Sequence, residues 1–221
     1  MRRFRMNRQS IPKATLGRLP HYLQYLKNFP VNSCNTISAA AIARGLSLGE
    51  VQVRKDLAMV SGAGKPKVGY ERLELIDTLE CYLGYNQLTK AVLVGAGKLG
   101  KALLDYDGFE EYGVKIIAGF DCNEQVLQPG KNAKLILPIT ELASYCTDNE
   151  VKLGIITVGR GSAQDVCDKM VASGIAAIWN FAPCELTVPS NVMLKQKNLG
   201  LSLAHLNLTL IKSRCDSLEK A

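Results

Sequence analysis

The sequence predicts an α/β fold with a winged helix-turn-helix domain (residues 1–84), a Rossmann-type parallel-sheet domain (85–198) and a C-terminal helix (199–221). Three observations predict it. Before residue 84, apolar residues recur every three or four positions, which is helical spacing. After residue 90, short apolar runs alternate with helical stretches, as in a parallel sheet covered on both faces. A glycine-rich motif, Gly95 to Gly100, stands at the first strand-to-helix junction.

Charge and composition narrow the class of protein. Residues 1–70 carry 12 Lys and Arg against 2 Asp and Glu, whereas residues 71–221 carry 15 against 18. This asymmetry favours a polyanionic partner for the first domain only. Met1 to Arg5 reads as a basic arm and not as a signal peptide, because no apolar segment follows. No apolar run is long enough to span a membrane.

The seven cysteines are widely spaced and contain no C-x-x-C motif. A disulfide framework or a zinc site is therefore not expected, and a reducing cytoplasm fits. We expect these cysteines to be small buried apolar residues.

The first domain reads as helices with one Gly/Pro-rich interruption. Pro20 either kinks the first helix or marks its start. Ser38 is the expected N-cap of a short helix ending near Gly45, and Ser47 that of a helix from Leu48 to about Met59. Two short helices joined by a tight turn form a helix-turn-helix. The apolar face of the first helix comprises Leu16, Leu19, Leu23, Leu26 and Phe29.

The second helix of such a unit enters the major groove of DNA. Here it offers Gln52, Arg54, Lys55 and Asp56. The basic, Gly-rich segment from Ser61 to Tyr70 predicts a wing along the phosphate backbone, followed by a helix over 71–83 and a turn over 84–87. The residues expected to contact double-stranded DNA are Lys13, Arg18, Ser38, Gln52, Arg54, Lys55, Lys65, Lys67 and Tyr70.

Strands and helices alternate in the second domain. The predicted strands are Ala91–Val94, Val114–Phe120, Lys134–Leu137, Val151–Val158, Ala176–Trp179 and Val192–Leu194. The predicted helices lie near 99–106, 138–147, 162–173 and 184–186, and a last apolar helix runs from Leu199 to about Ser217.

The glycine motif matches G-x-G-x-x-G in the context of a dinucleotide site. It follows an apolar strand and opens a helix, and Asp121 ends the second strand 21 residues after Gly100. At that distance an acid accepts hydrogen bonds from the adenine ribose. No Lys or Arg directly follows Asp121 to receive a 2′-phosphate, so NAD(H) is favoured over NADP(H). The alternative is a glycine turn without a ligand.

Two later strand ends, Thr157–Gly161 and Asn180–Pro183, are expected to face the same cleft, since ligands of such sheets bind beyond the carboxyl ends of the strands. For Asn180, a structural role in the turn and a contact to nicotinamide stay equally open. The expected cofactor-binding residues are Gly95, Ala96, Gly97, Lys98, Leu99, Gly100, Tyr106, Asp121, Cys122, Val158, Gly159, Asn180, Phe181 and Pro183. No metal ligand and no catalytic residue is expected.

Three functions compete. An NAD-dependent oxidoreductase needs a proton donor near the nicotinamide, yet His21 and His205 both lie away from the strand ends of the second domain, and no Y-x-x-x-K pair occurs. A scaffold that binds CoA or a nucleotide is disfavoured by Asp121 at ribose spacing. Binding without turnover, combined with DNA binding, explains the charge asymmetry as well.

These residues resemble the Rex family of redox-sensing transcriptional repressors over roughly residues 11–210. The first domain contributes Ile11–Thr15, Arg18–Pro20, Gln52–Leu57, Gly64-Lys65 and Val68–Tyr70. The second contributes Val94–Gly100, Ala102–Leu104, Tyr106, Gly108-Phe109, Phe120-Asp121 and Asn180–Pro183.

The resemblance implies a homodimer with an exchanged C-terminal helix, which NADH releases from operator DNA and which NAD+ leaves competent to bind. Tyr106 and Leu201 are candidates to sense the nicotinamide. Three departures stand out. The family's Asp-Leu-Ala start of the last helix is matched by Gly200-Leu201-Ser202, without the acid that couples cofactor state to domain arrangement. Gly159 replaces a proline, and the wing sequence Lys65-Pro66-Lys67 differs.

Overall fold

The computed structural model describes residues 11–30, 35–127 and 134–218, with side chains to residue 212 in the last helix. The chain forms two compact units, Met1–Gln87 and Leu88–Ala221. The predicted basic arm and Cys34 lie outside the described residues.

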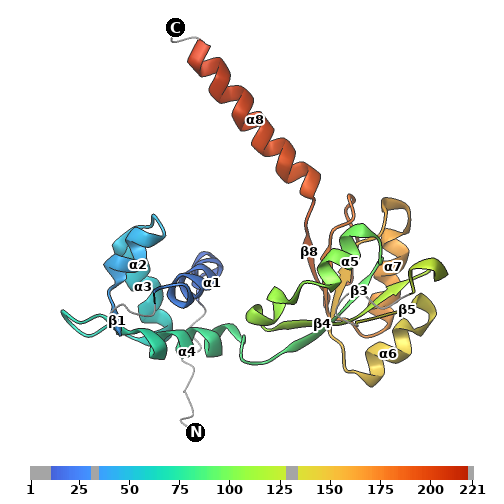
Figure 1. Cartoon of the computed structure of the whole chain (residues 1–221), viewed down its shortest axis with the longest axis horizontal. Helices are drawn as coiled ribbons and strands as arrows, with labels where there is room; N and C mark the ends of the chain where they lie inside the picture. Colours follow the sequence, from blue (N-terminus) through green and yellow to red (C-terminus); the bar gives the residue numbers. More distant parts are fainter. Residues whose placement is uncertain (1–10, 31–34, 128–133, 219–221) are drawn as a thin grey trace. The chain divides into compact units, whose positions relative to one another are not determined.

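The N-terminal unit contains four helices and a two-stranded antiparallel sheet among its described residues (Figure 1). The sheet pairs Thr36 with Glu71 and Ile37 with Tyr70. The elements are α1 (Lys13–Lys27), β1 (Thr36–Ile37), α2 (Ala39–Gly45), α3 (Glu50–Ser61), β2 (Tyr70–Glu71) and α4 (Arg72–Leu83). Their shared core includes Leu19, Tyr22, Leu26, Ile42, Val53, Leu57 and Leu79. This is the predicted helix-turn-helix, with a hairpin following α3.

Two details of the first helices were open or differ from the sequence prediction. Of the two alternatives for Pro20, the structure excludes a helix start, since Pro20 lies inside α1, which begins at Lys13. Ser47 does not cap α3: it has a positive φ of 54° in the turn, and Gly49 is the N-cap. Ser38 does cap α2, because its side chain accepts the N–H of Ala41 at 3.1 Å.

A buried polar cluster joins α1 to α3. The carboxylate of Asp56, 3 % exposed, accepts hydrogen bonds from the hydroxyls of Thr15 (2.9 Å) and Tyr22 (2.7 Å). It also accepts Nε of Arg18 at 2.7 Å and Nη2 at 2.9 Å. The expectation that Asp56 lies on the DNA-facing side of its helix is therefore wrong. The acid sits on the inner face, where four hydrogen bonds compensate for its burial.

The second unit contains a parallel sheet of six strands in the order β5-β4-β3-β6-β7-β8. The strands are β3 (Thr89–Val94), β4 (Val114–Asp121), β5 (Leu135–Pro138), β6 (Leu153–Ile156), β7 (Ala177–Asn180) and β8 (Met193–Gln196). The helices are α5 (Lys98–Leu104), α6 (Leu142–Asp148), α7 (Arg160–Ala172) and α8 (Leu199–Leu218), with 3-10 turns η1 (Asp107–Tyr112), η2 (Glu124–Val126) and η3 (Ile139–Glu141). This is the strand order of a dinucleotide-binding Rossmann fold.

Each strand sends alternate side chains to opposite faces of the sheet. Val92 and Val94 join a core with α6 and α7, whereas Ala91 and Leu93 join a core with α5. Both faces of β3 are therefore buried, which explains why this strand is apolar at successive positions.

The predicted helix near 184–186 is absent, since residues 181–192 form an irregular connection between β7 and β8. The three residues that suggested it are too few to complete helical turns.

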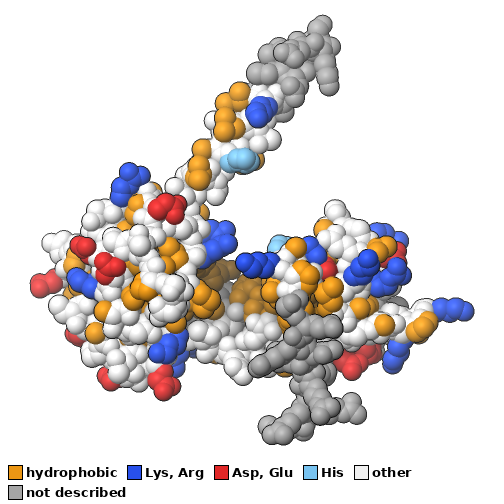
Figure 2. All heavy atoms as spheres, turned by 180° about the vertical axis from the view of Figure 1, so that it is seen from behind, with side chains coloured by type: hydrophobic (Ala, Val, Ile, Leu, Met, Phe, Trp, Pro, Cys, Tyr) orange, Lys and Arg blue, Asp and Glu red, His pale blue; other side chains and the backbone are white. Residues whose placement is uncertain are grey.

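The last helix, α8, begins at Leu199, and all its described side chains are exposed. Hydrophobic atoms recur along it (Figure 2). Asn198 Oδ1 accepts the N–H of Leu201 at 3.0 Å and so serves as the N-cap. An acid opening a helix commonly holds that position, so Asn198-Leu199-Gly200 matches the family's Asp-Leu-Ala better than Gly200-Leu201-Ser202. The acid is still missing, with a neutral amide in its place.

We predict that Asp56→Ala destabilises the N-terminal unit by about 3 kcal/mol, because the variant leaves Arg18 without its carboxylate. Burial raises the pKa of Asp56, but the hydrogen bonds from Arg18, Tyr22 and Thr15 outweigh it and hold that pKa below its ordinary value. The stabilisation is therefore present at neutral pH and is lost as pH falls through the lowered pKa.

Amide hydrogen exchange over α1 and α3 in the full chain measures this loss. Asp77→Ala, which removes an exposed acid of α4, is the control. Equal exchange rates in the two variants at neutral pH would contradict the assignment.

Candidate cofactor and DNA-binding sites

The glycine-rich turn lies where the strand order reverses. Strand β3 pairs with β4 on one side and β6 on the other, and their carboxyl ends meet at Gly95, Asp121 and Thr157. Such a switch point leaves a crevice in which open α/β sheets bind ligands. Gly97 is the N-cap of α5, and no side chain caps this helix. The N–H groups of its first turn are therefore available to an anion.

The glycines of the turn have the conformations that the motif requires. Gly95 adopts φ +104°, and a side chain there would meet Val158 and the backbone of Thr157 at 2.8–2.9 Å. A Cβ on Gly100 would collide with the carbonyl oxygen of Gly95. Gly97 has open space around it, as needed where a ligand approaches the backbone closely.

Three hydrogen bonds brace this turn. The N–H of Gly95 donates to the carbonyl of Phe120 at 2.8 Å. The N–H of Ala96 donates to Asp121 Oδ2 at 2.7 Å. The hydroxyl of Thr157 lies 2.7 Å from the carbonyl oxygen of Gly95. The sequence predicted the glycines, Asp121 and a strand end at Thr157 beside the cleft, but the contact of Thr157 with Gly95 becomes visible only with the strand order.

Asp121 is half-buried and holds the turn as well as facing the crevice. Its second oxygen, Oδ1, accepts the N–H of Asn123 at 2.9 Å. Each carboxylate oxygen can accept more than one hydrogen bond, so acceptor capacity remains for ribose hydroxyls.

The cysteines differ in their exposure. Cys122, the residue after Asp121, and Cys81 on α4 are exposed, whereas Cys146 and Cys167 are buried. The expectation of buried cysteines therefore fails at Cys81 and Cys122.

At β7, the structure favours the structural role for Asn180. This side chain is fully buried. Its Nδ2 donates to Gln196 Oε1 at 2.6 Å and to the carbonyl of Cys184 at 3.1 Å, and its Oδ1 accepts the N–H of Ala182 at 2.9 Å. With its amide engaged inside the protein, Asn180 shapes the strand end.

The remaining predicted cofactor residues differ in how far they are exposed to solvent. Lys98, Leu99, Gly159 and Pro183 are exposed, and Val158 and Phe181 are half-buried. The ring of Phe181 packs against Trp179 with centroids 4.4 Å apart. Tyr106 is 54 % exposed and packs edge-on against Phe109 at 4.9 Å. These side chains are accessible to a ligand.

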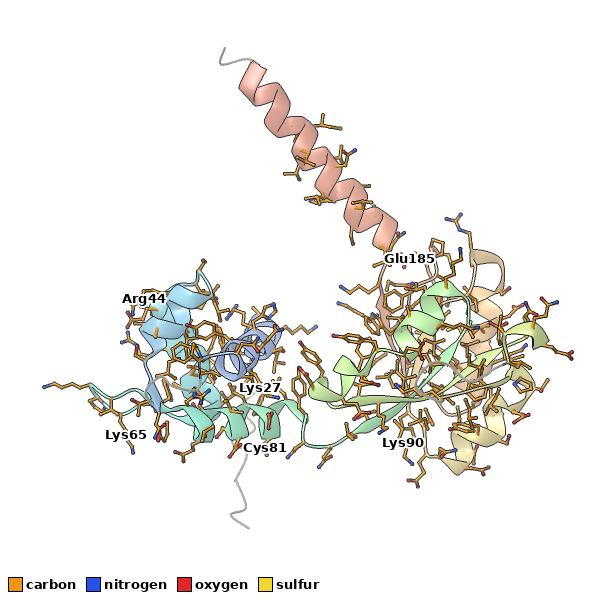
Figure 3. All side chains as sticks on the ribbon, viewed as in Figure 1. Lys27, Arg44, Lys65, Cys81, Lys90 and Glu185 are labelled. Carbon is orange, nitrogen blue, oxygen red and sulfur yellow. The ribbon has the colours of Figure 1, made fainter. Side chains whose placement is uncertain are left out.

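The helix-turn-helix unit presents a cationic surface. On α3, Gln52, Arg54 and Lys55 are exposed, and Arg54 has a weak 3.9 Å contact with Glu50. Lys13 is exposed at the start of α1, and Lys65 and Lys67 are exposed in the hairpin. The hairpin is closed by hydrogen bonds between Lys65 and Gly69, and Figure 3 labels Lys65 on it.

Two of the residues predicted to contact DNA, Tyr70 and Arg18, also have structural roles in the N-terminal unit. Tyr70 is buried in the core of the unit, and its ring would contact a Cβ placed on Gly64. Arg18 uses two of its guanidinium nitrogens on Asp56, and its side chain is 25 % exposed. Tyr70 therefore fixes the base of the wing, and Arg18 links α1 to the recognition helix. Both resembled DNA ligands in sequence because aromatic and cationic residues serve either role.

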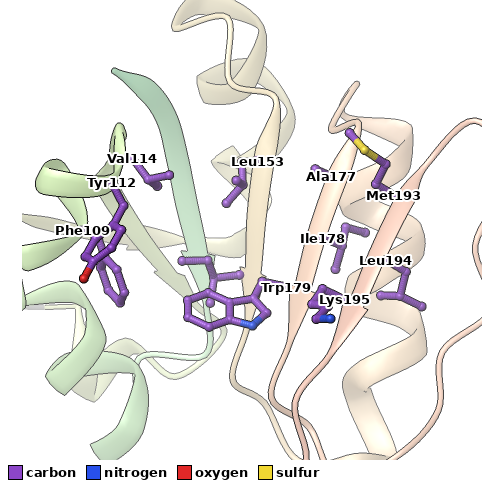
Figure 4. A pocket seen from close by; sticks show the side chains of 11 residues that line it. Phe109, Tyr112, Val114, Leu153, Ala177, Ile178, Trp179, Met193, Leu194 and Lys195 are labelled. Carbon is purple, nitrogen blue, oxygen red and sulfur yellow. The ribbon is translucent and has the colours of Figure 1, made fainter. Parts of the chain in front are cut away.

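An apolar groove of about 330 Å³ crosses the sheet of the second unit on the side of η1 (Figure 4). Strands β6, β7 and β8 contribute Leu153, Trp179 and Met193, and η1 contributes Phe109 and Tyr112. Met193 is 70 % exposed. Exposed apolar grooves of this kind indicate a surface for another protein segment.

Neither a metal site nor a membrane span emerges from the part of the chain that the structure describes. It contains no cluster of three or more His, Cys, Asp or Glu placed to hold an ion. None of its helices is long and apolar enough to cross a membrane.

Family models match both units of the chain. Residues 10–58 match the "Putative DNA-binding protein N-terminus", and residues 86–184 match the "CoA binding domain". The second match covers the glycine-rich turn and the first five strands of the sheet.

Curated relatives are similar along most of their length. The redox-sensing transcriptional repressor Rex of Porphyromonas gingivalis is 36% identical over 88% of this chain and 89% of its own. That of Carboxydothermus hydrogenoformans is 40% identical over 87% and 93%.

Solved structures of the protein RSP are similar to this chain over nearly its whole length. RSP in complex with β-NAD+ and operator DNA has a TM-score of 0.86 and 29% identity, covering 95% of this chain and 97% of that one. RSP in complex with β-NADH has a TM-score of 0.80 at the same identity, covering 94% and 98%.

Proposed function

Because the chain belongs to the Rex family of redox-sensing transcriptional repressors, we propose that it represses transcription from operator DNA and is released when NADH replaces NAD+ in its Rossmann site. The observation that carries this proposal is the likeness to RSP over nearly the whole chain. That protein has been solved with NAD+ and operator DNA together and with NADH alone. The alternative, an NAD-dependent oxidoreductase, has no comparable support.

For the cofactor, we propose that the pyrophosphate lies on the glycine-rich turn and the first turn of α5, with Asp121 at the adenine ribose. The acid disfavours a 2′-phosphate, and the residues that directly follow it, Cys122-Asn123-Glu124, include no Lys or Arg, so NAD(H) is preferred over NADP(H). The resemblance to a CoA-binding domain is compatible with this, because the fold is shared and the ribose acid is the distinguishing feature.

We propose that Val158, Gly159 and Phe181 line the nicotinamide end of the crevice, with Tyr106 as a further candidate contact. NADH and NAD+ differ only in that ring, which is cationic when oxidised. An apolar surrounding favours the neutral reduced ring, because a cation loses more hydration on burial. We therefore expect NADH to bind more tightly than NAD+.

For DNA, we propose that α3 enters the major groove with Gln52, Arg54 and Lys55, while Lys65 and Lys67 of the wing meet the backbone. Lys13 and Ser38, both exposed at helix N-termini, are further candidates for backbone contacts. Arg18 acts chiefly by holding α1 against α3.

We further propose a homodimer in which α8 is exchanged. This helix exposes leucines over its described length, among them Leu203 at 67 %, Leu206 at 59 % and Leu210 at 53 %. Apolar surface of that extent is unfavourable in water unless a partner covers it. The apolar groove beside η1 offers a surface of matching chemistry in the second copy.

A regulator of this kind needs no catalytic group, and we propose that the cofactor is bound and not turned over. We expect the protein to act in the cytoplasm, where operator DNA and the NADH pool are both found.

The direct test measures the affinity of the protein for a DNA duplex that it has selected from a random pool. The affinity is measured at fixed salt with NADH, with NAD+ and without cofactor. We expect saturating NADH to weaken binding about 5- to 150-fold, the range of usual coupling free energies. The neutral Asn198 in place of the family's acid favours the lower part of that range. Equal affinity in all three conditions would exclude a redox-sensing repressor.

We predict that Asp121→Arg weakens NADH binding at least about tenfold, since it removes the ribose acceptor and the bond to Ala96, worth about 1.4 kcal/mol together. Calorimetric titration measures the affinity. Asp165→Arg, an exposed site on α7, should bind like the wild type. An Asp121→Arg variant with unchanged affinity would remove this acid from the cofactor site.

We predict that Arg54→Ala and Lys55→Ala each reduce operator affinity. Removal of a side chain that reads a base should cost about 1–3 kcal/mol of binding free energy. Removal of a side chain that meets a phosphate should instead reduce the slope of log binding constant against log salt concentration by about one. Fluorescence anisotropy over a salt series separates the two. Lys90→Ala, in the other unit, is the control. If α3 is not the recognition helix, both variants will match that control in affinity and slope.

We predict that the triple variant Leu203→Ser, Leu206→Ser and Leu210→Ser is monomeric, because it replaces three neighbouring exposed leucines of α8 with polar residues and so weakens the apolar contact with the second copy. Light scattering coupled to size-exclusion chromatography gives the mass. Asn207→Ser on the same helix should stay dimeric. A dimeric triple variant, or a monomeric wild type, would rule out exchange of α8.

A further inference from the structure

We propose that Thr157 is a positioning residue of the dinucleotide site: its hydroxyl fixes the carbonyl of Gly95 and with it the shape of the glycine-rich turn. The proposal rests on the proposed function of the site. It concerns a side chain that the glycine motif does not include and that comes from a strand 60 residues further along the chain.

The contacts of Thr157 indicate which carbonyl oxygen accepts the hydrogen bond from its hydroxyl. Its N–H donates to the carbonyl of Val94 at 2.9 Å, continuing the pairing of β6 with β3. Its Oγ1 lies 2.7 Å from the carbonyl oxygen of Gly95 and 3.1 Å from that of Val94. A hydroxyl has one proton to donate, and either carbonyl oxygen has a lone pair to accept it, so the two distances decide. The shorter contact, to Gly95, is therefore the hydrogen bond that the side chain adds.

This bond completes a set of anchors that approach the turn from both sides. From β4, the carbonyl of Phe120 holds the N–H of Gly95, and the carboxylate of Asp121 holds the N–H of Ala96. These two anchors take N–H groups and leave the Gly95 carbonyl to Thr157, on the β6 side. The turn is thus fixed across the switch point at three successive backbone groups.

A glycine in such a turn needs a hydrogen-bond partner to hold its peptide group in one conformation. Gly95 adopts φ +104°, and a glycine has many other conformations of similar energy. Its carbonyl is also pressed against α5, because a Cβ on Gly100 would meet that oxygen and would lie 3.0 Å from Thr157 Oγ1. The oxygen therefore lies between the Thr157 hydroxyl and the first turn of the helix that receives the pyrophosphate.

Loss of the hydroxyl would leave the Gly95 carbonyl without its side-chain donor and let the peptide rotate. The N–H groups that follow would then be less well placed for a phosphate. Pre-organisation of this kind raises affinity because the binding event need not order the loop. One hydrogen bond contributes about 0.5–1.5 kcal/mol, so the expected loss is about two- to tenfold in NADH affinity.

The test is calorimetric titration of the full-length protein with NADH and, separately, with adenosine. Adenosine has the ribose that Asp121 contacts but lacks the pyrophosphate. Thr157→Val keeps the shape of the side chain and removes the hydroxyl, Thr157→Ser restores it, and Thr157→Ala replaces the valine variant should that one not fold. Thr147→Val is the matched control, since its hydroxyl donates to the carbonyl of Ala143 on the exposed side of α6.

We expect Thr157→Val to lose about two- to tenfold in NADH affinity, with a smaller loss for adenosine, and Thr157→Ser and Thr147→Val to stay near the wild type. Wild-type NADH affinity in the valine or alanine variant would overturn the proposal, as would equal losses for NADH and adenosine or failure of serine to restore binding. A wild-type protein that binds no NADH would instead overturn the proposed function, and this inference with it.

Discussion

The cofactor unit depends on the parallel pairing of β3 with a strand on each side. Because β4 and β6 flank it and their connections depart in opposite directions, the carboxyl end of β3 opens into a crevice. Everything assigned to the dinucleotide is located by that pairing. It places the glycine-rich turn at the centre, Asp121 on one side and Thr157 on the other. Hydrogen bonds from both neighbours then hold the turn.

The features that the sequence predicted well are those set by local rules. The glycine spacing, the acid at the end of the second strand and the alternation of apolar runs with helices all follow from backbone geometry and period. Ser38 was predicted as an N-cap for the same reason and is confirmed. The family resemblance added the domain order and the cofactor class, and the comparisons confirm the family.

The features that the sequence did not predict depend on which side of an element faces the core. Asp56 lies between Lys55 and Leu57, and only the packing of α1 on α3 decides that it points inward to Arg18 and Tyr22. Packing likewise decides that the Tyr70 ring is buried in the core and that the Asn180 amide is hydrogen-bonded inside the second unit. Thr157 was expected at a strand end facing the cleft, but its hydrogen bond to Gly95 was not predicted, because the two residues are 62 positions apart in sequence.

The buried and bridging polar groups bear on how a regulator with two binding sites couples them. The cofactor and DNA sites belong to separate units, so any response must be a coupling free energy between them. Asp56 and Arg18 fix the recognition helix within one unit, and Asp121 and Thr157 fix the turn within the other. Each site is thereby pre-organised by its own unit, and the redox response is left to the link between units, in which the dimer and α8 are the proposed elements.

The most direct measurement of that link is the NADH affinity of the protein free and bound to its operator. Coupling between two binding sites is reciprocal, so an effector that lowers DNA affinity must itself bind more weakly to the DNA complex by the same factor. A repressor released by NADH therefore binds NADH about 5- to 150-fold more weakly when operator DNA is present. Identical NADH affinity with and without the operator would mean that the two sites are independent, and it would contradict the account.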